Sequence, residues 1–163
     1  MKFKVRIQTA GTAGMSNANP LTTARIGGHP IHPMLVPFPI VCFVGALVTD
    51  LIYWGTAAGQ WETFSIWLLT GGLIMAAFAV LAGLIDFVSS ARIRSLAPAW
   101  PHVIGNALVV LLSIINAFVH SRDGYTAVVP TGLFLSALVV VLMAFTSWLG
   151  REMVFRHRVG VTE

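Results

Sequence analysis

Long apolar segments alternate with short polar links along most of this chain. Four of the segments are long enough to cross a hydrocarbon core about 30 Å thick, which takes roughly 20 residues of α-helix. We expect membrane spans at about 36–55, 64–88, 102–120 and 128–149. Because the links are short, consecutive spans run antiparallel and lie next to each other. The pattern predicts an all-α, integral membrane, up-and-down four-helix bundle.

Small and polar residues recur at helical spacing inside these spans. In lipid, helices associate through small residues and interhelical hydrogen bonds, so such faces point into the bundle. On the second span this face carries Gly72, Ala76, Ala79, Gly83 and Asp86. On the third it carries His102, Asn106, Val109, Ser113, Asn116 and His120. Two further pairs, Gly45 with Thr49 and Gly132 with Ser136, are interpreted as packing positions without chemistry of their own.

Composition and charge also indicate a membrane protein. It is 56% hydrophobic and 10% charged, with a mean hydropathy of +0.83, a formal net charge of +4 and a pI near 10.0. The basic residues lie in tails and links, so a lipid bilayer rather than nucleic acid is the expected partner. Nine of the ten fall on one side of the predicted membrane: Lys2, Lys4, Arg6, Arg25, Arg92, Arg94, Arg151, Arg156 and Arg158. Only Arg122 falls on the other side, so both termini are predicted to be cytoplasmic.

The chain divides into a tail and a membrane domain. Residues 1–28 are predicted to be a flexible cytoplasmic tail and residues 29–163 the four-helix domain. The tail lacks the apolar core and small-residue site of a cleavable signal, so the first span is expected to be retained. Met15 is an alternative start, which would leave residues 1–14 untranslated.

Histidines and prolines gather before the first span, in the text His29-Pro30-Ile31-His32-Pro33. A residue before proline is biased away from the α conformation. We therefore expect a stiff extended strap, with regular helix starting near Pro37 or Pro39. The predicted topology brings five polar residues to the cytoplasmic side, namely His29, His32, Asp86, His102 and Asn106. His157 follows the fourth span on the same side.

Three interpretations of this cluster stay open. Neutral imidazoles bind haem b or a transition metal, so His29, His32 and His102 are candidate ligands, with Asp86 and Asn106 orienting them. The chain would then be an electron-transfer or accessory component. Alternatively, these side chains satisfy one another and the backbone around the prolines, in a cofactor-free subunit of a larger membrane complex or a homo-oligomer. The third interpretation is a proton or small-ion conduit along the third span.

A carboxylate is also predicted deep in the first span. Asp50 lies 14 residues after Val36, about 21 Å along a helix, where an unpaired charge is expensive. Its natural partners are Asn116, His120 and Arg122, in a helix-clamping hydrogen bond or in the conduit. The lone Cys42 excludes an intrachain disulfide. No nucleotide-binding glycine loop, Ser/His/Asp elbow or His-Glu-x-x-His motif is present, so a conventional hydrolase or kinase is not expected.

The sequence resembles a bacterial membrane family known as domain of unknown function 2231. The matching text is Gly28 to Ile40 with its His-Pro-x-His-Pro motif, Asp50, Gly83-Leu84-Ile85-Asp86, His102 with Asn106, and Val154 to Val161. Leu149-Gly150 stands where the family often has a Gly-Gly pair. The resemblance implies the four-helix fold and a bacterial cytoplasmic (inner) membrane, and it carries no activity. By architecture the chain is also loosely similar to small membrane cytochromes of the b type.

Overall fold

The computed structural model describes residues 19–122 and 124–161. Two short strands come first and form an antiparallel hairpin, followed by helices and one short 3-10 turn. The elements are β1 (Arg25–Ile26), β2 (His29–Pro30), α1 (Ile31–Leu35), α2 (Pro37–Thr56), α3 (Gly59–Ser89), α4 (Ala91–Arg94), α5 (Ala99–His120), η1 (Tyr125–Ala127) and α6 (Thr131–Phe155). Met15, the alternative start, and residues 1–14 before it lie outside the described residues.

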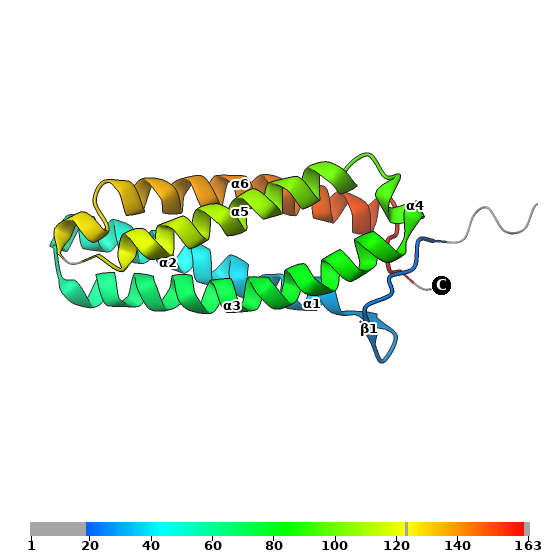
Figure 1. The fold of residues 1–163 in the computed structure, drawn as a ribbon, viewed down its shortest axis with the longest axis horizontal. Helices are drawn as coiled ribbons and strands as arrows, with labels where there is room; N and C mark the ends of the chain where they lie inside the picture. Colours follow the sequence, from blue (N-terminus) through cyan, green and yellow to red (C-terminus); the bar gives the residue numbers. More distant parts are fainter. Residues whose placement is uncertain (1–18, 123, 162–163) are drawn as a thin grey trace, which may run out of the picture.

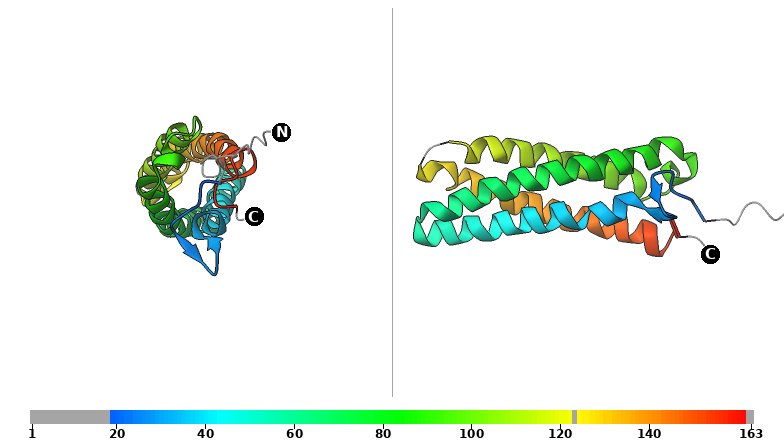
Figure 2. Two further views of the ribbon diagram at one scale, coloured as in Figure 1. Left: turned by 90° about the vertical axis from the view of Figure 1, so that its right-hand side faces the viewer. Right: turned by 90° about the horizontal axis from the view of Figure 1, so that it is seen from below.

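Four long helices run the length of one elongated bundle (Figures 1 and 2). Helix α2 packs against α3 and α6, and α5 packs against the same two neighbours, so α2 and α5 face each other across a diagonal. Both described ends of the chain lie at one end of the bundle (Figure 2). They are joined there by a hydrogen bond from the Gly160 amide to the Pro20 carbonyl at 2.8 Å. The predicted all-α four-helix architecture is confirmed.

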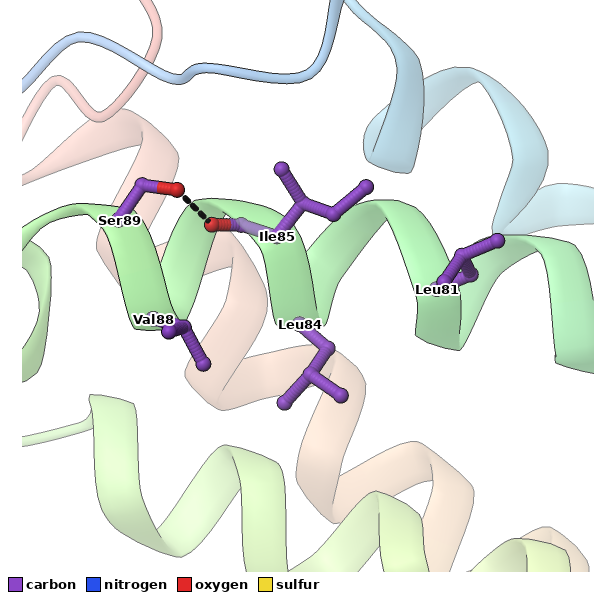
Figure 3. Close-up of a pocket in the computed structure, with 5 residues that line it drawn as sticks. All are labelled: Leu81, Leu84, Ile85, Val88 and Ser89. Carbon is purple, nitrogen blue, oxygen red and sulfur yellow. Dashed lines mark hydrogen bonds between the residues drawn. The ribbon is translucent and has the colours of Figure 1, made fainter.

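The outer surface of the bundle is apolar, as a lipid-facing surface must be. In the most apolar window of each long helix only 22–28% of the residues are buried inside the protein. Large hydrophobic side chains such as Val41, Phe78 and Phe118 are more than half exposed. Figure 3 shows one shallow depression of about 260 Å³ on α3, lined by four aliphatic residues and Ser89. The Ser89 hydroxyl donates to the Ile85 carbonyl at 2.6 Å, so this hydroxyl is hydrogen-bonded within the helix where it faces lipid.

Two helices extend beyond the apolar segments that predict them. Helix α3 starts at Gly59 rather than near residue 64, and it includes Glu62 in its first turn, where a carboxylate suits the helix dipole. Helix α6 starts at Thr131 and continues to Phe155, past the predicted end at 149. An ion pair between Arg156 and Glu152 at 2.7 Å lies at that end. Hydropathy marks only the part of a helix that lipid surrounds, which is why the polar ends were missed.

The predicted extended strap was partly wrong. His29 and Pro30 are extended, but Ile31–Leu35 form a turn of helix, α1, despite the proline after His32. Val36, which precedes Pro37, also has α dihedral angles. Tertiary contacts override the local bias of residues before proline: α1 packs against α3, and the His32 ring bonds to α3. Because Pro37 has no N–H, a new helix begins there as α2.

The bundle interior has three layers. The middle layer is apolar and consists of Phe43, Ala46, Leu69, Ala76, Val109, Val139 and Met143. Toward each end of the bundle this layer is followed by a group of buried or half-buried polar side chains. One group surrounds His32 and His102, near the chain ends, and we call it the terminal site. The other surrounds Asp50 and His120, near the interhelical links at the far end, and we call it the link-end site.

Candidate functional site

His32 and His102 meet in the terminal site. Their ring centroids are 6.1 Å apart and the planes are nearly perpendicular, at 84°. Nδ1 of His32 lies 2.7 Å from the Ala79 carbonyl on α3, and Nδ1 of His102 lies 2.9 Å from the Thr146 carbonyl on α6. A carbonyl oxygen only accepts, so both Nδ1 atoms carry the hydrogen and donate. In the neutral imidazole Nε2 is then the nitrogen with the free lone pair.

A glycine lies against each of these rings. A Cβ on Gly83 would lie 2.7 Å from Nδ1 of His32, and a Cβ on Gly150 would lie 3.1 Å from Cε1 of His102. Each glycine follows, by four residues, the carbonyl that its histidine contacts. In an α-helix that carbonyl also accepts from the N–H of the glycine, so a ring that reaches it has to pass over the glycine. The missing side chains make room for the two hydrogen bonds.

Asn106 lies beside the His102 ring. Its Nδ2 donates to the His102 carbonyl at 2.8 Å and lies 3.4 Å from both ring nitrogens of His102. The Thr146 hydroxyl donates to Oδ1 of Asn106 at 3.4 Å. Thr146 on α6 therefore contacts both side chains: its carbonyl oxygen accepts from the His102 ring, and its hydroxyl donates to the Asn106 amide oxygen. Asn106 thus contacts His102, and the orienting role that the sequence predicts for it stays a prediction.

The other predicted ligands lie elsewhere. His29 is exposed on β2 and lines a separate groove of about 430 Å³ with residues such as Met34 and Val161. His157 follows α6 and is half-buried. Within the described ranges no group of three or more His, Cys, Asp or Glu residues is arranged to hold a metal ion. The site predicted from three histidines and one acid is therefore, in this structure, a pair of histidines.

Asp86 holds the start of the described chain. Its Oδ1 accepts hydrogen bonds from the backbone amides of Thr23 and Ala24, at 2.6 and 2.7 Å. The Ala24 carbonyl in turn accepts from the amide of Ile31 at 3.0 Å. Residues 19–28 are thus tied to α3 and to the start of α1. The predicted boundary between a tail and a domain at residue 28 stays a prediction.

The link-end site is built around Asp50, which is fully buried. Its Oδ1 accepts from the Ser65 hydroxyl at 2.5 Å and lies 2.9 Å from Nε2 of His120, while Oδ2 accepts from the Ser136 hydroxyl at 2.6 Å. Ser136 also accepts from Nδ2 of Asn116 at 2.8 Å. All four long helices therefore contribute to the site.

Two of the partners predicted for Asp50 are found, and one is not. His120 contacts it directly and Asn116 reaches it through Ser136, whereas Arg122 is exposed. The expectation that Ser136 adds no chemistry is wrong, because its hydroxyl bonds to the carboxylate. A serine in a small-residue pattern gives no sign of its hydrogen-bond partner, so only the helix pairing could identify it.

The paired histidines of the terminal site and the Asp–His pair of the link-end site have the same separation in sequence. His102 follows His32 by 70 residues, and His120 follows Asp50 by the same 70 residues. In both cases the first residue comes from the hairpin of α2 and α3, with α1, and the second from the hairpin of α5 and α6. Helices α2 and α5 run in the same direction across the diagonal, so the hairpins are related by an axis along the bundle. Each site lies where equivalent positions of the two hairpins face each other.

The comparisons with known proteins agree with this architecture. Residues 28–163 match the model of a family described as predicted membrane protein (DUF2231). The chain belongs to this family. The family match contains every residue of both sites, from His32 to Thr146, and begins at the glycine before the His-Pro-x-His-Pro motif. No curated protein and no solved structure matches the chain.

Proposed function

We propose that this protein is a small electron-transfer or accessory component of the bacterial inner membrane that binds one haem b between His32 and His102. The observation that supports it is the fixing of both Nδ1–H groups by backbone carbonyls. Histidines that ligate metals nearly always donate their other ring N–H to a carbonyl, a carboxylate or water, which fixes the tautomer and aims Nε2 at the metal.

The number of ligands favours haem over a bare ion. Among the described residues only two histidines meet, and no third His, Cys, Asp or Glu joins them. A structural zinc ion takes four protein ligands and a catalytic zinc ion takes three. A haem would need only two ligands from the protein, which His32 and His102 would supply. When bound, it would contribute one-electron transfer.

The separation of the rings suits two ligands on one metal atom. With metal–nitrogen bonds of about 2.0–2.1 Å and an imidazole ring about 1 Å in radius, two rings on one atom lie up to about 6 Å apart. The observed 6.1 Å is close to that limit. Asn106 would have to turn aside, because its Nδ2 lies 3.4 Å from Nε2 of His102.

The terminal site belongs, in this proposal, to the cytoplasmic side of the membrane. The support is the distribution of basic residues: Arg25, Arg92, Arg94, Arg151, Arg156 and Arg158 lie at or next to the end of the bundle where the described chain begins and ends. Arg122 lies at the other end, in the link after α5. Cytoplasmic loops of membrane proteins carry the excess of Lys and Arg.

The other two interpretations fit the structure less closely. A through-conduit would need a polar path between the two sites, but an apolar layer that includes Phe43, Leu69 and Met143 separates them. A cofactor-free subunit of a larger complex or a homo-oligomer would bury part of the outer apolar surface. That surface serves lipid equally well, so it does not favour a protein partner.

The test is an absorption spectrum with metal analysis on the detergent-purified protein, before and after dithionite. We expect a Soret band and a reducible α band, about one iron per chain, and loss of both bands in His32→Ala and in His102→Ala. His29→Ala is the matched control and should keep the bands, because His29 lies on the hairpin away from the pair. If the protein is colourless and has no stoichiometric metal, the haem proposal is rejected. If it is colourless and has one atom of another metal per chain, the ligand of the two histidines is a metal ion instead of haem.

A further inference from the structure

The link-end site holds a hydrogen that hydrogen-bond geometry alone can locate. Nδ1 of His120 lies 3.0 Å from the carbonyl oxygen of Asn116, which is a pure acceptor, so Nδ1 carries a hydrogen and donates it. Nε2 of the same ring lies 2.9 Å from Oδ1 of Asp50. If Asp50 were a carboxylate and Nε2 were bare, two lone pairs would face each other at that distance. One hydrogen therefore lies between the two residues.

This hydrogen makes Asp50 and His120 a pair with no net charge. The pair is either a carboxylate with an imidazolium or a carboxylic acid with a neutral imidazole, and the two forms differ by the transfer of one proton over a 2.9 Å contact. Both side chains are completely buried. An isolated charge at this depth would be far more costly than a neutral pair that shares its proton.

Hydroxyl groups surround the pair and extend it into a hydrogen-bonded chain. Ser65 and Ser136 donate to the two oxygens of Asp50, and Thr49 lies 2.7 Å from the Ser65 hydroxyl. Oδ1 of Asn116 is buried and has no hydrogen-bond partner within the described residues. A buried acceptor without a protein donor is a natural place for a bound water.

The two directions along the bundle differ in what separates the pair from water. Toward the terminal site the apolar layer intervenes, and it contains nothing that can relay a proton between Leu69, Val139 and Met143. In the other direction His120 is the last residue of α5, and the link that follows is exposed at Ser121, Arg122 and Gly124 and buried at Ala127 and Val128. The ionisable groups described at that end are Tyr53, Glu62, Arg122 and Tyr125, and none of them has a described hydrogen bond to the pair.

We propose that Asp50 and His120 together bind one exchangeable proton, which enters and leaves only at the link end of the bundle. The site is independent of the haem proposed at the other end, and its ligand is a proton that the carboxylate and the imidazole share. Asp50 accepts or donates it directly, His120 is its alternative carrier, and Ser65 and Ser136 hold the carboxylate in place.

The shared proton is tested by nitrogen NMR of the protein labelled with ¹⁵N-histidine in lipid bilayers. We expect Nε2 of His120 to be bonded to, or to share, a hydrogen at neutral pH. In Asp50→Asn the side-chain amide donates instead, so Nε2 should become a bare acceptor while Nδ1 keeps its hydrogen. Ser65→Ala is the control and should leave the hydrogen on the pair. A bare Nε2 in the wild-type protein together with a carboxylate signal from ¹³C-labelled Asp50, or an Nε2 that keeps its hydrogen in Asp50→Asn, would overturn the proposal; helical circular dichroism verifies the fold of each variant.

The one-sided exchange is tested by proton flux into liposomes under a potassium diffusion potential. The wild-type protein should not conduct. Phe43→Ala opens the apolar layer and should give a proton leak, which Asp50→Asn in the same background should abolish. A leak through the wild-type protein, or a leak in Phe43→Ala that is indifferent to Asp50, would each contradict the assignment. A haem spectrum that is unchanged in Asp50→Asn would show that the two sites are separate, so failure at one does not reject the other.

Discussion

Gly83 is the position where a single methyl group tests the geometry of the terminal site most sharply. In Gly83→Ala the new Cβ would lie 2.7 Å from Nδ1 and 3.0 Å from Cε1 of His32, which is closer than real Cβ contacts allow. The ring must move, and it then loses its hydrogen bond to Ala79. Losing that bond costs about 0.5–1.5 kcal/mol and overpacking about 1–3 kcal/mol, against about 1 kcal/mol gained in helix propensity. We expect a net loss of about 1–3 kcal/mol of stability.

Gly71 provides the matched control on the same helix. A Cβ there would meet nothing within 4 Å, so Gly71→Ala should leave stability unchanged or raise it by up to about 1 kcal/mol. The assay is reversible unfolding in mixed micelles with increasing SDS, followed by circular dichroism, on both variants and the wild-type protein. The two substitutions should have opposite signs, or at least differ by more than 1 kcal/mol. Equal effects at the two positions would refute the placement of the His32 ring against Gly83.

Three further predictions follow from other contacts. Asp86→Ala removes the acceptor of the Thr23 and Ala24 amides and should free the segment before β1, so trypsin should cleave after Arg25 several-fold faster; an unchanged rate would show that other contacts hold it. Glu152→Ala removes only an exposed ion pair with Arg156 and should change unfolding by less than about 1 kcal/mol, and a larger loss would mean that this pair does more than surface pairs do. Gly72→Ala would bring a Cβ within 2.6 Å of the Phe43 ring in the apolar layer and should destabilise by about 1–3 kcal/mol in the same SDS titration, whereas a stable variant would argue that the layer is loosely packed.

The fold could be predicted from the sequence because lipid imposes one strong rule. Each span must be a continuous apolar helix, and that rule is written into the hydropathy pattern. The inward face of the third span was predicted correctly, since Val109, Ser113, Asn116 and His120 are buried. The polar first turn of α3 and the last turns of α6 were missed because they obey helix propensity and capping outside the apolar segments.

The sites were predicted in part, and the limit was pairing between helices. The topology placed His32 and His102 at the same end of the bundle, but it could not separate them from His29 and Asp86. Those two lie at the same end without joining the pair: His29 is on β2, and Asp86 accepts from the Thr23 amide. Leu149-Gly150 stands where the family often has two glycines, and the His102 ring packs against the glycine that is kept, Gly150. The residue types alone do not show which glycine a histidine ring packs against or which backbone carbonyl accepts its hydrogen bond.

Electron paramagnetic resonance on the oxidised, detergent-purified protein tests the central proposal most directly, because it reports the ligands of the iron rather than its presence. Two histidine ligands predict a low-spin ferric signal in the wild-type protein that is lost together with the haem bands in His32→Ala and in His102→Ala and is unchanged in His29→Ala. A high-spin or iron-free wild-type protein, or a low-spin signal that persists without His102, would contradict a haem held between His32 and His102.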